Sequence, residues 1–311
     1  MQKPDCDREL IDALGAYLRR VTEILGSATP RTGFGGAVPL VVLLRQLRTA
    51  TAIVVLIDRG YADDAGPLVR ALAAGTISFA ALTQTDSEDR GYLFARHGRD
   101  RQLKWSDSVI ERNRILAEKE KTLPPEQRTF RLSEEKMLAA RALLEKRWND
   151  QLAAALEGRA EPRPLGGSTR TWHGLNDAEM AKRADALEIY RGIYDVSSDW
   201  SHQLFTVMLS VLKELHDSRM VTIGPTYSSA TYIALSVRDC VNRLLADAVR
   251  HYGLDVGDEP LQLDQSLTQA IRLYTICKGD QDSMARAREL LAQEDAPADE
   301  PGGPDESEKS A

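Results

Sequence analysis

The chain has 311 residues, of which 42% are apolar and 28% are charged, and its formal net charge is −7. This composition is ordinary for a soluble globular protein, and the length is sufficient for a real core. Residues 294–311 hold seven acidic residues and one lysine, so the remainder of the chain is nearly neutral. A nearly neutral body excludes a strongly basic nucleic-acid-binding surface, although it leaves room for a local basic pocket.

The cysteines, the amino terminus and the longest apolar run all predict a cytoplasmic protein that does not enter a membrane. The three cysteines are isolated and odd in number, which is typical of a reduced intracellular setting. The first ten residues contain acids and no apolar run, unlike a signal peptide. The apolar run 38–57 contains Arg45 and Arg48 and makes a poor membrane span. We also expect no metal site and no cofactor, because no metal-ligand spacing occurs.

Helix-forming residues dominate the chain, and the spacing of the apolar residues predicts an all-α fold. In the amino-terminal part we expect helices at residues 5–25, 39–58 and 64–83. The segment 29–36 (TPRTGFGG) between the first two is expected to be a loop. It is not a dinucleotide-binding loop, because no strand precedes it.

Residues 86–157 are expected to form a charged helical hairpin inserted in a single helical domain, 1–293. The charged stretch from residue 86 is interrupted by Pro124 and Pro125, and Ser133 is well placed to cap a second charged helix. Two helices joined by a short turn pack antiparallel and here would protrude from the body. The hairpin is either a solvated surface pair or a surface that binds a partner.

In the carboxyl-terminal part we expect a loop, several helices and a disordered tail. A long helix should begin at Asn176 or Asp177 and run to about His216. Further helices are expected at residues 227–251, 263–276 and 281–293, followed by a disordered acidic tail, 294–311. The whole fold is therefore predicted to be an irregular multi-helix bundle.

A ladder of polar side chains in the long helix is the main candidate for a functional site. Tyr190, Tyr194, Ser198 and His202 recur every four residues, so on an α-helix they form one stripe. Their hydroxyl and imidazole groups can donate and accept hydrogen bonds. If the network is closed it specifies a rigid core, and if one end is open it lines a pocket. Both alternatives stay open, so His202 is either a structural residue or a general acid/base.

Arg70 is the second candidate, because it is a lone charge among the apolar residues of the third helix. It either pairs with Asp195 or Asp199 of the long helix or binds an anion, since a guanidinium presents a fixed fork to phosphate or carboxylate. If the second and third helices pack on the long helix, Arg45 and Arg48 would converge on the same place.

Two other motifs in the chain do not support a catalytic assignment. Ser198 and His202 lie in mid-helix, where no free backbone N–H group can build the oxyanion hole of a serine hydrolase. The pair Arg90 and His97 has the spacing of a defence-type ribonuclease motif, but the many arginines in the chain make one such match expected by chance.

Three segments resemble a known family, the bacterial helical proteins of domain of unknown function family 5677. They are PLVRAL with Arg70, TWHGLN with Trp172, and YRGIYDVSSDWSH at 190–202, and the resemblance extends over about 38–216. Members often carry an acid one turn after the arginine, where this chain has Ala74. The resemblance implies an all-helical fold and no established activity. Relatives similar to helical nuclease or toxin groups suggest a stress- or phage-defence setting.

The leading hypothesis is a protein that binds an anionic ligand, such as a nucleotide or RNA phosphate; if it is an enzyme, the expected reaction is cleavage of RNA without a metal. His202 would be the general acid/base and Arg70 would stabilise phosphate charge. The predicted ligand-binding residues are Tyr190, Tyr194, Ser198, Arg45 and Arg48. The alternative is a non-catalytic protein-interaction module that uses the charged hairpin.

Overall fold

The computed structural model describes residues 5–29, 32–84, 86–124, 127, 133–201 and 230–277, and these parts of the chain are all-α, as the sequence predicts. His202, the expected helix 281–293 and the acidic tail 294–311 lie outside the described residues. The described helical elements are α1 (Asp5–Gly26), α2 (Phe34–Asp58), η1 (Asp63–Ala65), α3 (Gly66–Leu82), α4 (Ser87–Glu120), α5 (Glu134–Leu156), α6 (Asp177–Arg183), α7 (Leu187–Ile189), the π-helical η3 (Tyr190–Tyr194), α8 (Asp195–Ser201), α10 (Ala230–Tyr252) and α11 (Glu259–Cys277).

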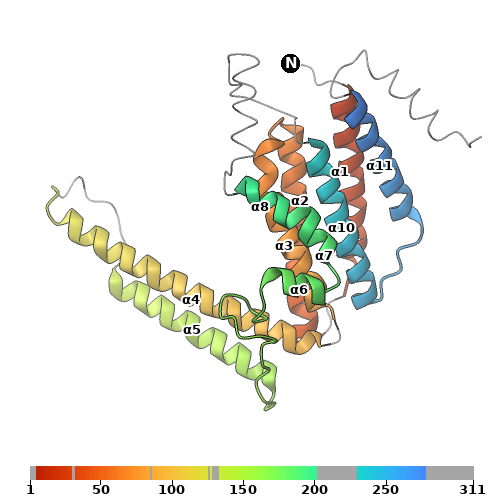
Figure 1. Cartoon of the computed structure of the whole chain (residues 1–311). Coiled ribbons are helices and arrows are strands. Elements are labelled where there is room, and N and C mark those ends of the chain that lie inside the picture. The colour runs from red at the N-terminus through yellow and green to blue at the C-terminus, as the bar shows by residue number, and fades with distance from the viewer. Residues whose placement is uncertain are drawn as a thin grey trace, which may run out of the picture.

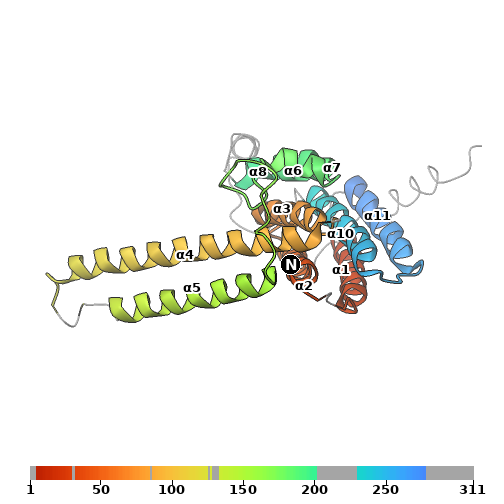
Figure 2. The same cartoon turned by 90° about the horizontal axis from the view of Figure 1, so that it is seen from below.

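Helix α3 lies at the centre of the body and positions the candidate site. It packs against α2 and α10, and the short elements α6, α7, η3 and α8 cross over it (Figure 1). Helices α1 and α11 pack on each other beside α10 (Figure 2). Because α3 is surrounded by other helices, most of its positions must be apolar or small, and Arg70 is its one charged residue.

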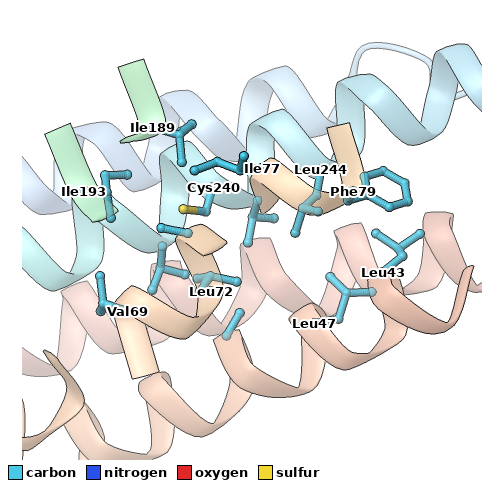
Figure 3. Packing of buried hydrophobic residues seen from close by; sticks show 14 of the residues in the cluster. Leu43, Leu47, Val69, Leu72, Ile77, Phe79, Ile189, Ile193, Cys240 and Leu244 are labelled. Carbon is cyan, nitrogen blue, oxygen red and sulfur yellow. The ribbon is translucent and has the colours of Figure 1, made fainter. Parts of the chain in front are cut away.

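Leucine and isoleucine side chains from several helices interlock around α3 (Figure 3). Leu72 and Phe79 of α3 are fully buried and belong to the same cluster as Leu43 of α2 and Leu244 of α10. Each such side chain stabilises the fold by roughly 1.5–3 kcal/mol. Cys240 of α10 lies in this core, where burial raises the pKa of its thiol to about 12. A thiol with so high a pKa is not a nucleophile at neutral pH.

Helices 34–58 and 63–82 are long and apolar enough to cross a membrane, and 39% and 61% of their most apolar windows are buried inside the fold. The core helix of a soluble protein meets the same criterion, so this observation is weak evidence about localisation.

Helix α2 begins at Phe34, five residues earlier than the sequence predicts, because a carboxylate from another helix caps it. Glu88 of α4 accepts hydrogen bonds from the N–H groups of Phe34 (2.9 Å) and Gly35 (2.6 Å). Gly33 precedes the helix at φ 83°, a conformation that favours glycine. The glycine-rich segment is therefore the first turn of a helix whose free N–H groups already bind an internal anion.

The prediction of one continuous helix from residue 177 to 216 is wrong for the first part of that range. The chain turns after α6, where Asp185 adopts φ 53°, and it resumes as α7 and η3. Arg243 of α10 donates hydrogen bonds to the carbonyl oxygens of Ala184 (2.9 Å) and Asp185. Asp247, which is 2% exposed, holds Arg243 at 2.8 Å. The break is thus stabilised by a side chain about sixty residues away, which no local pattern reveals.

Helices α4 and α5 lie antiparallel and extend away from the other helices (Figures 1 and 2). Ser133 caps α5 as the sequence predicts, and its hydroxyl accepts a hydrogen bond from the N–H of Lys136. The two helices are joined by ion pairs, Arg114 with Glu134 at 2.6 Å and Arg141 with Asp107. Few apolar side chains are buried between the outer parts of these two helices.

Candidate functional site

The tyrosines of the predicted ladder lie on a single turn of π-helix. In η3 the N–H of Asp195 donates to the carbonyl of Tyr190, five residues back, instead of the usual four. The rings of Tyr190 and Tyr194 stack with centroids 5.3 Å apart and planes 23° from parallel. Such a turn is frequent at functional sites, because it re-aims side chains that an α-helix would place elsewhere.

Tyr194 joins Arg70 of α3 to Asp177 at the start of α6, and these three residues form what we call the Arg70 cluster. The guanidinium Nη2 of Arg70 donates to the Tyr194 hydroxyl at 3.2 Å. That hydroxyl donates to Oδ2 of Asp177 at 2.8 Å. The guanidinium carbon also lies 5.1 Å from the centroid of the Tyr194 ring, within the range of a cation–π contact. One phenol therefore contacts the cation with both its ring and its oxygen.

The surroundings of Tyr194 keep its hydroxyl protonated. Burial raises the pKa of the Tyr194 phenol above its ordinary value, and the hydrogen bond to Asp177 raises this pKa further. A protonated phenol donates one hydrogen bond and accepts another. Arg70 is positive and can only donate, and Asp177 is negative and can only accept. The hydrogen bonds therefore run from Arg70 to Tyr194 and from Tyr194 to Asp177.

Part of the Arg70 guanidinium is left without a partner. Its Nε atom is buried and makes no hydrogen bond with any of the described residues. Over the same part of the chain no carboxylate forms an ion pair with Arg70, and the position one turn later on α3 is Ala74. A buried donor without an acceptor costs free energy, and a guanidinium that gains a charged acceptor recovers it.

The other predicted site residues lie at different places. Arg45 and Arg48 are exposed on α2, and the described part of the chain shows no contact between them and Arg70. Ser198 is half-buried on α8, and Asp195 is exposed at its start. His202, the proposed acid/base, follows directly after the last described residue of α8.

Sequence reasoning missed Asp177 and His173 as members of this region. Asp177 was visible only as an acid in a first helical turn, a position that many helices fill in the same way. Its seventeen-residue separation from Tyr194 matches no helical period. His173 is 5% exposed, and its Nδ1 accepts a hydrogen bond from the N–H of Leu175 at 3.1 Å. Burial lowers the pKa of His173 to about 4, so the ring is neutral at physiological pH.

The loop before α6 is held in a defined shape that positions both residues. Gly174 has φ 77°, and a side chain there would overlap the carbonyl oxygen of Gly166. The ring of Trp172 packs edge-on against Phe94 of α4 with centroids 5.6 Å apart. Asn176 then caps α6 reciprocally with Glu179. The tryptophan segment therefore anchors the helix whose first residue is Asp177.

A cavity of about 510 Å³ lies on a different side of η3, between this segment and α10. Ile189, Gly192 and Ile193 line it together with Tyr232 and Arg243. The lining does not include Arg70 or Tyr194, so this hollow is separate from the Arg70 cluster. In the described part of the chain, no group of three or more His, Cys, Asp or Glu residues is placed to hold a metal ion.

Comparison with known proteins gives a family and no individual relative. No curated protein and no solved structure matches the chain. The model of a family of unknown function, DUF5677, matches residues 36–219. This span includes most of α2, all of α3 and the hairpin, and the three residues of the Arg70 cluster, and it covers more than half of the sequence. The chain therefore belongs to the DUF5677 family of unknown function.

Proposed function

We propose that this protein binds an anionic ligand, of the nucleotide or RNA phosphate class, at the Arg70 cluster. The observation that carries the proposal is the buried, unpartnered Nε of Arg70 beside a phenol that already orients the guanidinium. A planar guanidinium fork matches the oxygens of a phosphate. Tyr190, stacked on Tyr194, extends an aromatic surface on which a base can stack.

We further propose that the ligand is RNA and that the site cleaves it without a metal. His202 would accept the proton of the attacking ribose hydroxyl and return a proton to the leaving oxygen. Arg70 would neutralise the charge that develops on the phosphate. A cytoplasmic protein of stress or phage defence is the setting we propose, on the support of the isolated cysteines and the family resemblance.

Binding is tested by fluorescence anisotropy with a short, labelled single-stranded RNA. Arg70→Gln should weaken binding by about tenfold or more, a loss of about 1.4 kcal/mol per factor of ten. Arg59→Gln is the matched control, because Arg59 is a 75% exposed arginine at the end of α2. It should change affinity by less than about twofold, as expected of a solvated charge. Equal losses in the two variants would show only non-specific charge attraction and would contradict the proposal.

Cleavage is tested separately with His202→Ala. The variant should retain RNA binding, lose cleavage, and melt within a few degrees of the parent chain. If wild-type protein binds the RNA but never cuts it, the binding proposal stands and the cleavage proposal is wrong. Complete unfolding of His202→Ala would instead show that the imidazole is a structural residue.

A second candidate function, a non-catalytic protein-interaction module, is favoured by the surface of the hairpin. Large apolar side chains in α4, α5 and the turn after α4 are exposed to solvent, and an exposed apolar patch marks an interaction site. They are Trp105, Val109, Ile115, Leu123, Leu138 and Leu143. Replacing residues 101–145 with a short Gly/Ser linker should abolish association with a partner and leave RNA binding at the Arg70 cluster unchanged. Retained association would contradict this candidate.

A further inference from the structure

One face of α4 carries an apolar and basic strip that no other described helix covers. Six residues spaced four, four, three, four and three apart share this face of the helix, and we call them the α4 strip. They are Arg101, Trp105, Val109, Arg112, Leu116 and Lys119. Trp105 is 67% exposed and Val109 is 38% exposed. An indole so exposed leaves a large apolar surface in water, which marks it as a contact residue.

The α4 strip points away from α5. The residues of α4 that meet α5 include Asp107 and Arg114, which pair with α5 side chains, and Arg99 and Gln102, which are hydrogen-bonded to Asn149 and Trp148. Asp107, the buried Ile110 and Arg114 follow each other at three and four residues and so occupy a different face from Trp105 and Val109. The strip is therefore not part of the hairpin's own packing.

Most acids of the outer part of α4 are already paired with a base. The pairs are Asp100 with Arg99, Asp107 with Arg141, Glu111 with Arg114 and Glu118 with Lys121. Arg101, Arg112 and Lys119, together with Lys104 beside them, form no ion pair within the described residues. The unbalanced positive charge therefore coincides with the exposed apolar side chains.

We propose that the α4 strip binds an acidic amphipathic helix of a partner protein. The strip runs from Arg101 to Lys119, about 27 Å along the helix axis, which equals five turns of a partner helix. Trp105, Val109 and Leu116 would pack between the apolar side chains of that helix, and its carboxylates would pair with Arg101 and Arg112. A partner protein is favoured over a nucleic acid because apolar side chains make up half of the strip.

This inference rests on the second candidate function and is independent of the Arg70 cluster. It is tested with the full chain and a fluorescein-labelled peptide of 21 residues, helical, with leucines on one face and glutamates elsewhere. A peptide of the same composition in scrambled order is the control probe. The amphipathic peptide should bind at least tenfold more tightly than the scrambled one. Equal affinity for both peptides would overturn the proposal.

Three variants locate the binding on the α4 strip. Trp105→Ala and Arg112→Glu should each weaken binding of the amphipathic peptide by at least tenfold, with unchanged circular dichroism. Leu143→Ala is the matched control, because Leu143 is 70% exposed on α5 and lies outside the strip; it should leave affinity within twofold. Equal effects of Trp105→Ala and Leu143→Ala would overturn the assignment of the face. Tighter binding of a single-stranded RNA than of the peptide, lost in Arg112→Glu, would overturn the class of partner.

The chain in which a linker replaces residues 101–145 separates the two proposals. If that chain loses its partner while Trp105→Ala still binds it, the interaction module stands and the assignment of binding to the α4 strip is wrong. If both chains keep the partner, the second candidate function itself fails.

Discussion

Tyr190 and Tyr194 have stacked rings in the same turn, but their hydroxyl groups have different surroundings. The hydroxyl of Tyr194 bonds Arg70 and Asp177, whereas that of Tyr190 makes no hydrogen bond within the described chain. Tyr194→Phe should therefore lower the free energy of unfolding by about 1–2 kcal/mol, because a half-buried cation and a carboxylate lose their shared partner. Tyr190→Phe should lower it by less than about 0.5 kcal/mol. Chemical denaturation of both variants measures the difference, and equal losses would contradict the cluster.

The second prediction for a single residue concerns His173 and the dependence of folding stability on pH. Its pKa in the folded chain is about 4, below the ordinary value of 6.5, so folding favours the neutral ring. The unfolded chain binds the proton first, and stability is therefore lost as pH falls from about 6.5 toward 4.

The matched variant is His173→Gln, which keeps a polar side chain but does not titrate. Between pH 7 and 4 the free energy of unfolding, measured by chemical denaturation, should decrease less steeply for the variant than for the parent chain. The acidic residues titrate alike in both, so the difference reports His173. If the free energy of unfolding falls equally with pH in the two proteins, His173 is protonated in the folded protein over this range.

The residues of the Arg70 cluster differ in how far the sequence could predict them. Arg70 stood out because a charge among apolar residues requires a partner. The tyrosine stripe also stood out, from its four-residue spacing. Asp177 did not, because the loop anchored by Trp172 brings it to Tyr194, and neither periodicity nor composition predicts where a loop ends.

At the scale of elements, the start of α2 depends on how closely α4 approaches it. A side-chain carbon at Gly91 of α4 would lie 2.5 Å from the carbonyl oxygen of Phe34. Gly91→Ala should therefore push α4 away from the first turn of α2 and destabilise the fold by about 1–3 kcal/mol.

Gly98→Ala is the control on the same helix, because nothing lies within 4 Å of a side chain added there. It should stabilise the protein by about 0.5–1 kcal/mol, the usual gain for alanine over glycine in a helix. Thermal unfolding of the two variants should thus shift in opposite directions. A shift in the same direction would show that the two helices do not meet at Gly91.

Local signals predicted most helix boundaries, and contacts with distant residues account for the exceptions. Ser133 and Asn176 cap their helices as expected, because a cap involves only the next three residues. The early start of α2 and the break after α6 depend on Glu88 and Arg243, which belong to other helices. The π-helical turn likewise has no local signature in the sequence.

At the scale of the whole molecule, the hairpin and the body differ in how they are stabilised. Beyond Ala95 the buried residue of α4 is Ile110, and that of α5 is Leu152. Helix α10, by contrast, is buried along one whole side. Because ion pairs between exposed side chains contribute little, about 0–1 kcal/mol each, the far part of the hairpin should open without unfolding the body.

Hydrogen exchange measured by mass spectrometry tests this difference. Peptides from residues 101–120 and 134–150 should exchange much faster than peptides from α3 and α10. Addition of 1 M NaCl should accelerate hydrogen exchange in the hairpin more than in the body, because salt screens the ion pairs. Uniform protection across the chain would show instead that the hairpin is covered by another part of the protein.

The central claim is that the free edge of the Arg70 guanidinium receives a phosphate. The direct measurement is the Nε–H spectrum of protein labelled with ¹⁵N-arginine, titrated with sodium pyrophosphate at constant ionic strength and with Arg70→Lys identifying the resonance. The account predicts that the Arg70 signal shifts in a saturable way while that of the exposed Arg59 stays in place. An Arg70 signal that does not move, or that moves equally with sodium chloride, would contradict the account.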